Sequence, residues 1–234
     1  MTVRSSVASD FVALVAGLRF KNAFNPYSDT CADFDRPDAA AIRRANLTAA
    51  LEAALAKGVD SVWIARDLGY RGGRRTGLAL TDEAHLDAHA ILLGAKNFKR
   101  STLGPVAAER TATVIWRMLM EIKRPIFLWN VFPLHPHEPD HPMTNRSHTR
   151  SERHACRHVL VTLLDLLAPR SVLAIGRDAE IAMSDLGIAA KQVRHPSYGG
   201  QPEFIAGVSK HYGLKVRSST EETMPLFGQA DSGR

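Results

Sequence analysis

Cysteine is nearly absent from this chain of 234 residues, which contains only Cys31 and Cys156. No Cys-x-x-Cys pair is present, so one chain cannot supply the four thiolates of a structural zinc site or an iron–sulfur cluster. Isolated cysteines are also typical of a reducing compartment. The chain is long enough to build one sizeable hydrophobic core without such crosslinks.

Long apolar runs are also missing, and no segment reaches the length of a membrane span. The stretch from Phe11 to Leu18 is apolar, but Asp10 interrupts its start, which indicates an amphipathic helix rather than a signal peptide. We therefore expect a cytoplasmic protein. We expect a single α/β domain over residues 1–214, followed by a disordered tail over 215–234, where the residues are polar and small.

Acidic residues are in the minority, with 24 Asp and Glu against 30 Lys and Arg, for a net charge of +6. A basic surface favours a polyanionic partner, although this charge also fits any soluble basic protein. Charge alone therefore leaves nucleic-acid binding open.

Short apolar runs alternate with segments of helical periodicity. The predicted strands are Ser61–Ala65, Ile126–Trp129, Ser171–Ile175 and Gln192–Arg194. This alternation predicts a three-layer α/β/α fold with a central four-stranded parallel sheet.

Polar residues end three of these predicted strands: Asp67, Asn130 and His195. Because the carboxyl ends of parallel strands converge on one crevice, we expect a carboxylate, a carboxamide and an imidazole to share a pocket. Such a set suits the reading of a flat heterocycle and the activation of water beside it. Taken singly, Asn130 could instead cap its loop, and His195 could be a hydrogen-bonded core histidine.

The segment from Asp67 to Gly77 is rich in glycine and arginine, with Arg71, Arg74 and Arg75. Its glycines allow a close backbone approach to a ligand. It matches neither a dinucleotide fingerprint nor a phosphate loop. The alternative is a flexible basic surface turn.

Two further clusters carry chemically interesting side chains. His135, His137 and His141 alternate with prolines and acids, but their spacing fits neither one helical face nor a known zinc pattern. The basic run from Arg146 to Arg157 is best interpreted as a solvated helix face whose N-terminal end is available to phosphate.

Together these residues resemble the uracil-DNA glycosylase superfamily over about residues 24–213. Asp67 to Thr81 aligns without gaps with the water-activating segment, G-Q-D-P-Y-H followed by a Gly-Leu pair, here Gly77-Leu78. Asn130 matches the asparagine that reads uracil, and His195-Pro196-Ser197 matches the segment that opens the DNA-intercalating loop. Similarity to the iron–sulfur class is found at Asn145-Arg146, Glu152, Cys156 and Gly176-Arg177.

The chain also departs from the family pattern. Leu68 replaces the usual proline, Gly69 replaces the tyrosine that excludes the thymine methyl group, and Leu80 replaces the phenylalanine that stacks on uracil. The contact to the uracil ring is then expected from Leu80 itself, Tyr70 or Phe132. The intercalating loop lacks its leucine, and Tyr198 or Gln201 is expected to fill that role. Without the four cysteines, the resemblance is to a divergent class that has no iron–sulfur cluster.

The resemblance implies a monofunctional enzyme of base excision repair that acts on single- or double-stranded DNA containing uracil, as a monomer and without a metal or organic cofactor. Asp67 and His195 would be catalytic, and Asn130 would bind the base. Contacts to DNA are implied for Arg71, Arg74, Arg75, Ser197, Tyr198 and Gln201. The alternatives are a non-catalytic DNA- or nucleotide-binding protein and a metallohydrolase built on the histidine cluster.

Overall fold

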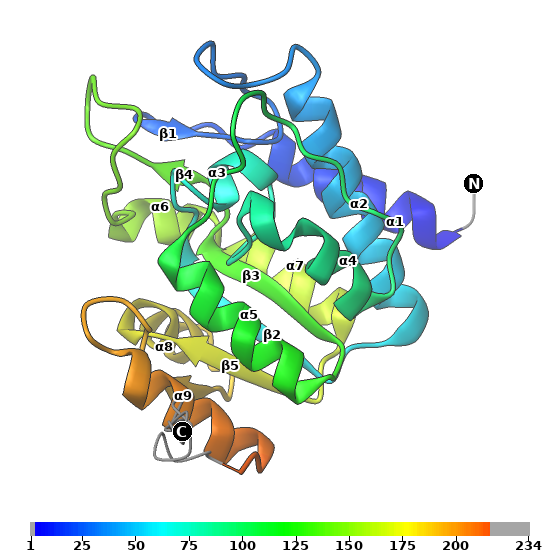
Figure 1. Cartoon of the computed structure of the whole chain (residues 1–234), viewed down its shortest axis with the longest axis vertical. Helices are drawn as coiled ribbons and strands as arrows, with labels where there is room; N and C mark the ends of the chain where they lie inside the picture. Colours follow the sequence, from blue (N-terminus) through cyan, green and yellow to red (C-terminus); the bar gives the residue numbers. More distant parts are fainter. Residues whose placement is uncertain (1–2, 216–234) are drawn as a thin grey trace, which may run out of the picture.

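The computed structural model describes residues 3–215, in which a four-stranded parallel sheet is covered by helices on both faces (Figure 1). The strands are β2 (Ser61–Asp67), β3 (Ile126–Phe132), β5 (Ser171–Ile175) and β6 (Lys191–Val193), in the order β3-β2-β5-β6. Apolar residues dominate the three longer strands, β2, β3 and β5, as expected where both faces of a strand are buried. The predicted parallel sheet is confirmed.

Helices fill the connections between the strands. Their bounds are α1 (Val3–Ala16), α2 (Ala39–Lys57), α3 (Gly73–Thr76), η1 (Glu83–His85), α4 (Leu86–Leu93), α5 (Arg110–Ile122), α6 (Arg150–Ala155), α7 (Arg157–Leu167), α8 (Arg177–Asp185) and α9 (Gln201–Tyr212). A short antiparallel pair, β1 (Ala23–Phe24) and β4 (His135–Pro136), lies outside the main sheet. None of the helices within residues 3–215 combines the length and apolar character that a membrane crossing requires.

Strand alternation divides the core into two layers of side chains, because successive residues of a strand point to opposite faces. Trp63 of β2 belongs to the cluster that packs against α5 and α9. Its neighbour Ile64 belongs to the cluster that includes side chains of α1, α2, α7 and α8. The three-layer α/β/α arrangement is therefore confirmed.

Some element boundaries differ from the predicted ones. β3 continues to Phe132, so Asn130 lies inside this strand and not at its end. The helix expected over residues 147–167 is divided at Cys156 into α6 and α7, and it begins only after Thr149. Thr149 caps α6, because its hydroxyl accepts a hydrogen bond from the Glu152 N–H while the Glu152 carboxylate accepts one from the Thr149 N–H. Except for Lys215, the tail expected over 215–234 lies outside the described residues.

Candidate active site

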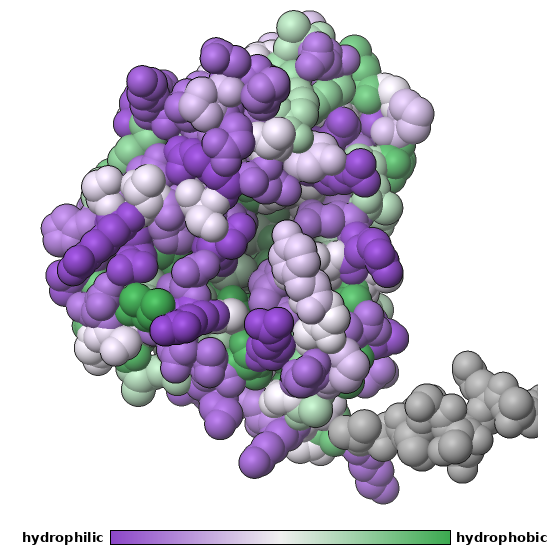
Figure 2. All heavy atoms as spheres, turned by 90° about the vertical axis from the view of Figure 1, so that its left-hand side faces the viewer, coloured by the Kyte–Doolittle hydropathy of each residue, from purple (hydrophilic) through white to green (hydrophobic). Residues whose placement is uncertain are grey.

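A pocket of about 490 Å³ opens at the carboxyl edge of the sheet. Asp67, the last residue of β2, and His195, two residues beyond β6, both line it. The strands run toward the left of Figure 1, and Figure 2 looks onto this edge, where a recess is surrounded mostly by hydrophilic side chains. The structure thus brings together two of the three residues on which the sequence analysis depends.

Asp67 is held in place from one side. Its Oδ2 accepts hydrogen bonds from the Arg66 Nε at 3.0 Å and from the His148 backbone N–H at 3.3 Å, and the His148 Nδ1 lies 3.4 Å from the same oxygen. All hydrogen bonds that the described residues make to this carboxylate fall on Oδ2. The second oxygen, Oδ1, is therefore left for a water molecule or a cationic centre in the pocket.

The ring of His195 is oriented by its own loop. The Ser197 backbone N–H donates to Nδ1 at 3.2 Å, and the Ser197 Oγ lies 2.7 Å from the same nitrogen. Because Nδ1 accepts, the neutral ring carries its proton on Nε2. Burial lowers the pKa of His195 to about 4, and the positive charges of Arg66 and Arg194 act in the same direction. His195 is thus a neutral donor at physiological pH.

Close approach of two loops explains how His195 reaches the pocket. Gly176, which ends β5, has a φ of 86° and would place a methyl group 3.3 Å from the His195 Cβ. A side chain at this position would be strained in this backbone conformation and crowded against the histidine. The glycine therefore allows the loop after β6 to pack directly on the end of β5.

Asn130 is not among the described residues that line the pocket, but it lies on the same face of the sheet as one that does. It pairs in register with Ala65, which lines the pocket, so the two side chains share one face. The side chain is buried at 1% exposure, and neither Oδ1 nor Nδ2 has a hydrogen-bond partner within residues 3–215. The interpretation of Asn130 as a loop cap is therefore wrong, because a capping side chain would be hydrogen-bonded to the loop.

The arginines of the glycine-rich loop are less available than the sequence suggested. Arg74 is 2% exposed, donates to the Pro142 carbonyl at 2.8 Å and lies 3.8 Å from the centre of the Phe24 ring. The prediction that Arg74 contacts DNA phosphate is therefore wrong. Arg75 is only half-buried, 3.8 Å from the ring centre of Phe34, and its contact with phosphate stays a prediction. By contrast, Arg71 is exposed, and its phosphate contact stays a prediction.

Of the four residues predicted to contact the base besides Asn130, two line the pocket and two do not. Gly69 and Leu80 are among the described residues that line the pocket, whereas Tyr70 and Phe132 are not. Phe132 is fully buried and packs against Phe20 at 5.2 Å between ring centres, so it is unavailable as a stacking surface. Gly69 and Leu80 thus remain the predicted contacts to the ring.

Glu109 is a pocket residue that the sequence analysis missed. Its backbone N–H donates to the Asp82 Oδ2 at 2.6 Å, which fixes it directly before α5. A methyl group at Gly72 would lie 2.4 Å from the Glu109 Oε2, so the carboxyl group lies against the glycine-rich loop. Burial and the nearby charge of Asp82 raise the pKa of Glu109. No motif marks this residue, because an irregular segment places it.

The loop after His195 continues the pocket into a second groove of about 720 Å³. Thr111, Ser197 and Tyr198 line both cavities, and Arg110 and Arg117 of α5 add positive charge to the groove. Gln201 also lines it, and Tyr198 projects into solvent with 98% of its surface exposed. The contacts of Ser197, Tyr198 and Gln201 with DNA stay predictions.

The histidine cluster has a different environment from the one that a metal would need. His135 is buried, with Nε2 2.8 Å from the Thr144 carbonyl oxygen and Nδ1 3.0 Å from a nitrogen of Arg74. Both ring nitrogens are thus engaged. Over residues 3–215, no group of three His, Cys, Asp or Glu side chains is arranged to hold a metal ion. Nothing in the described structure favours the metallohydrolase alternative.

The fold that places Asp67 and His195 in one pocket is similar to that of a solved structure. The fold resembles that of wild-type Pedobacter heparinus SMUG2. The two chains are 12% identical, with a TM-score of 0.58 over 91% of this chain and 97% of that chain. The likeness supports the expected uracil-DNA glycosylase-like α/β fold. No family model and no curated protein matches the chain.

Two buried histidines, His89 and His135, and the half-buried His195 favour their neutral form and predict an effect of pH on stability. Burial lowers the pKa of His89 to about 3 and that of His135 and His195 to about 4, from 6.5. In this window the unfolded chain binds more protons than the folded chain. The free energy of unfolding is therefore expected to be highest above pH 6.5 and to fall steadily toward pH 4. Urea unfolding at a series of pH values measures this slope.

A matched pair of variants tests the origin of that slope. His89→Leu should make the decline shallower, whereas the same change at the exposed His158 should leave it unaltered. Stability that does not change between pH 6.5 and 4 would contradict the burial of these rings as neutral groups.

Proposed function

We propose that this protein is a DNA glycosylase that removes uracil from DNA and leaves an abasic site. The observation that carries the proposal is one pocket lined by Asp67 and His195, together with the Asn130 carboxamide, which has no hydrogen-bond partner among the described residues and lies on the same face of the sheet as the pocket-lining Ala65. The structural likeness to SMUG2, a glycosylase of the uracil-DNA glycosylase superfamily, supports it.

Base recognition would follow from the geometry of an amide. The uracil nucleotide rotates out of the helix, which costs a few kcal/mol of lost stacking and pairing. The Oδ1 of Asn130 then accepts from N3–H of the base, while Nδ2 donates to O4. Cytosine presents the reverse pattern, an acceptor at N3 and a donor at C4. A fixed carboxamide therefore discriminates between the two bases.

Bond cleavage would use the two ionisable residues in different ways. As the C1′–N1 bond lengthens, negative charge moves onto the uracil ring and the sugar becomes cationic. The Nε2–H of His195 donates to O2, where part of the negative charge develops. Asp67 stabilises the cation through Oδ1 and accepts a proton from the water molecule that adds to C1′. Uracil leaves with the electron pair of the broken bond and is protonated in solution.

A His195→Gln variant should lower the rate of base release by about 10²–10³, the typical effect of losing one donor to a developing oxyanion. DNA affinity should change little. Because the pKa of His195 is lowered to about 4, the rate of the unmodified protein should show no inflection near pH 6.5. Single-turnover rates across pH measure both effects, and an inflection near 6.5 that disappears in the variant would contradict a neutral His195.

One assay tests the proposed function directly. A labelled oligonucleotide that contains a single uracil is incubated with the protein and then treated with alkali, which cleaves the strand at an abasic site. We expect cleavage at the uracil and none in a matched oligonucleotide that carries cytosine there. Binding of both oligonucleotides without any cleavage would instead favour the alternative, a non-catalytic DNA-binding protein.

The absence of a bulky side chain at position 69 predicts a broader range of bases. Gly69 lines the pocket where the classical enzymes have a tyrosine, so we expect larger or 5-substituted bases to enter as well as uracil. Excision of uracil, thymine and hypoxanthine from otherwise identical duplexes should be compared. Strict uracil-only activity would contradict this prediction.

A further inference from the structure

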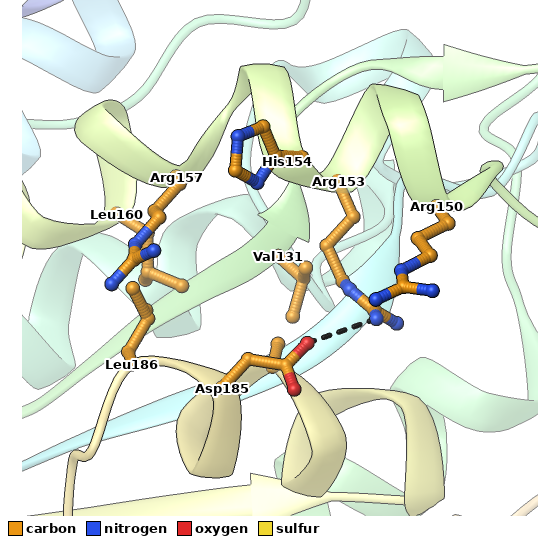
Figure 3. A pocket seen from close by; sticks show the side chains of 9 residues that line it. Val131, Arg150, Arg153, His154, Arg157, Leu160, Asp185 and Leu186 are labelled. Atoms are coloured by element: carbon orange, nitrogen blue, oxygen red, sulfur yellow. Dashed lines mark hydrogen bonds and ion pairs between the residues drawn. The ribbon is translucent and has the colours of Figure 1, made fainter.

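A third cavity, of about 240 Å³, lies between α6–α7 and α8 (Figure 3). We call it the arginine pocket. Its lining residues are Val131, Arg150, Arg153, His154, Arg157, Leu160, Ala182, Asp185 and Leu186. None of them lines the candidate active site. The basic run that the sequence analysis assigned to a solvated helix face therefore forms one wall of a concave site.

The lining of the arginine pocket is divided into an apolar floor and a basic rim. Val131, Leu160 and Leu186 give the floor its hydrophobic character. Arg150 and Arg153 are one helical turn apart on α6, and Arg157 begins α7, so the three guanidinium groups come from one side of the cavity (Figure 3). Such a lining favours a ligand that combines an apolar surface with negative charge.

The positive charge of this rim is only partly neutralised. Asp185 pairs with Arg153 at 3.0 Å and is the acidic residue among the lining side chains. Within residues 3–215, no carboxylate lies within 4.0 Å of the Arg150 or Arg157 guanidinium. Two exposed arginines thus remain available to an anion, and the planar guanidinium group both binds phosphate and stacks on bases.

The arginine pocket is close to the candidate active site through two elements. His148, whose backbone contacts Asp67, precedes Arg150 by two residues. Along α8, Asp178 lines the active-site pocket and Asp185 lines the arginine pocket, which corresponds to about 10 Å of helix. In Figure 1, α6, α8 and the loop before α9 all lie on the left-hand flank. The two cavities are therefore connected through α8 and through the residues that lead into α6.

We propose that the arginine pocket is a second nucleotide subsite, which takes one unstacked nucleotide of a single-stranded DNA whose uracil occupies the active site. The base lies against the apolar floor, and its phosphate lies between Arg150 and Arg157. A paired base in a duplex cannot enter without a second flipping event, so the subsite favours single-stranded substrate. This inference rests on the proposed glycosylase function.

Binding of a long single-stranded oligonucleotide, a duplex of the same sequence and a uracil-containing trinucleotide tests the subsite. The Arg150→Ala/Arg157→Ala double variant should weaken binding of the long single strand by about tenfold, a typical loss for one base contact. It should also reduce the salt dependence of that binding. Duplex affinity should fall much less, and base release from the trinucleotide should be unchanged.

Two further variants test whether charge at the arginine pocket itself determines binding of the single strand. Asp185→Asn removes the competing carboxylate and should tighten binding of the long single strand. Arg170→Ala, at an exposed position before β5 and at the opposite end of the sheet, is a control for loss of positive charge far from the pocket and should leave binding close to that of the unmodified protein.

The outcomes separate this inference from the function on which it rests. Equal weakening of single-strand and duplex binding would indicate general attraction by charge and would overturn the subsite. Unchanged single-strand affinity in the double variant would overturn it as well, in favour of another anionic occupant such as an acidic peptide. Failure of the unmodified protein to release uracil from any substrate would instead refute the glycosylase proposal itself.

Discussion

Asp67→Asn is expected to lower the rate of base release by about 10²–10⁴, the range typical for loss of a positioned acid–base group. The amide keeps the shape of the side chain but carries no charge to stabilise a sugar cation and cannot accept a proton from water. Because a negative charge near the DNA is removed, affinity for the oligonucleotide should stay the same or increase. Single-turnover rates and equilibrium binding, measured on the same uracil-containing strand, separate the two effects.

Asp178→Asn is the matched control for this variant. Asp178 also lines the pocket and lies 3.7 Å from Arg66, but its side chain is 46% exposed, against 7% for Asp67. If the pocket needs only negative charge, the two variants should lose activity to a similar degree. If Oδ1 of Asp67 has the specific role proposed above, the control should stay within a few fold of the unmodified protein. Equal losses would contradict the role of Asp67.

The sheet could be predicted because its strands are short apolar runs whose character is local. The strand Ser171–Ile175 has the boundaries that the sequence predicts, and Gly176 follows its last residue as expected. β3 was predicted to end at Trp129 because Asn130 is polar, yet the strand continues to Phe132. A polar residue inside a buried strand is costly, so pattern reasoning ends the strand there. Functional residues are where that reasoning is expected to fail.

That Asp67 and His195 line the same pocket could be predicted from the topology, because the carboxyl ends of parallel strands lie at one edge of the sheet. The inward position of Arg74 did not follow from any local pattern. Its partners, Phe24 and Pro142, come from distant segments, and composition cannot tell a buried arginine from an exposed one. Glu109 was missed for a related reason, because contact with Asp82 fixes it and no repeat or motif marks it.

Asn130→Leu is expected to raise the free energy of unfolding and, at the same time, to abolish uracil release. Both polar atoms of this carboxamide are buried without a partner in the described structure, and an unsatisfied buried group costs about 1–3 kcal/mol. Leucine has a similar volume and no polar atoms, so it should recover a comparable amount of stability. The same change removes the acceptor for N3–H and the donor to O4. Urea unfolding and the alkali assay measure the two effects.

Asn46→Leu is the matched control for Asn130→Leu. Asn46 is also buried, at 4% exposure, but its Nδ2 donates to the Lys99 carbonyl at 2.8 Å and its Oδ1 accepts from the Lys99 N–H at 2.9 Å. The same substitution there should lower stability and leave the chemistry of the pocket intact. Opposite signs at two buried asparagines would show that one amide serves the fold and the other a ligand. Destabilisation at both positions would mean that Asn130 is structural, and base recognition would then have to reside elsewhere in the pocket.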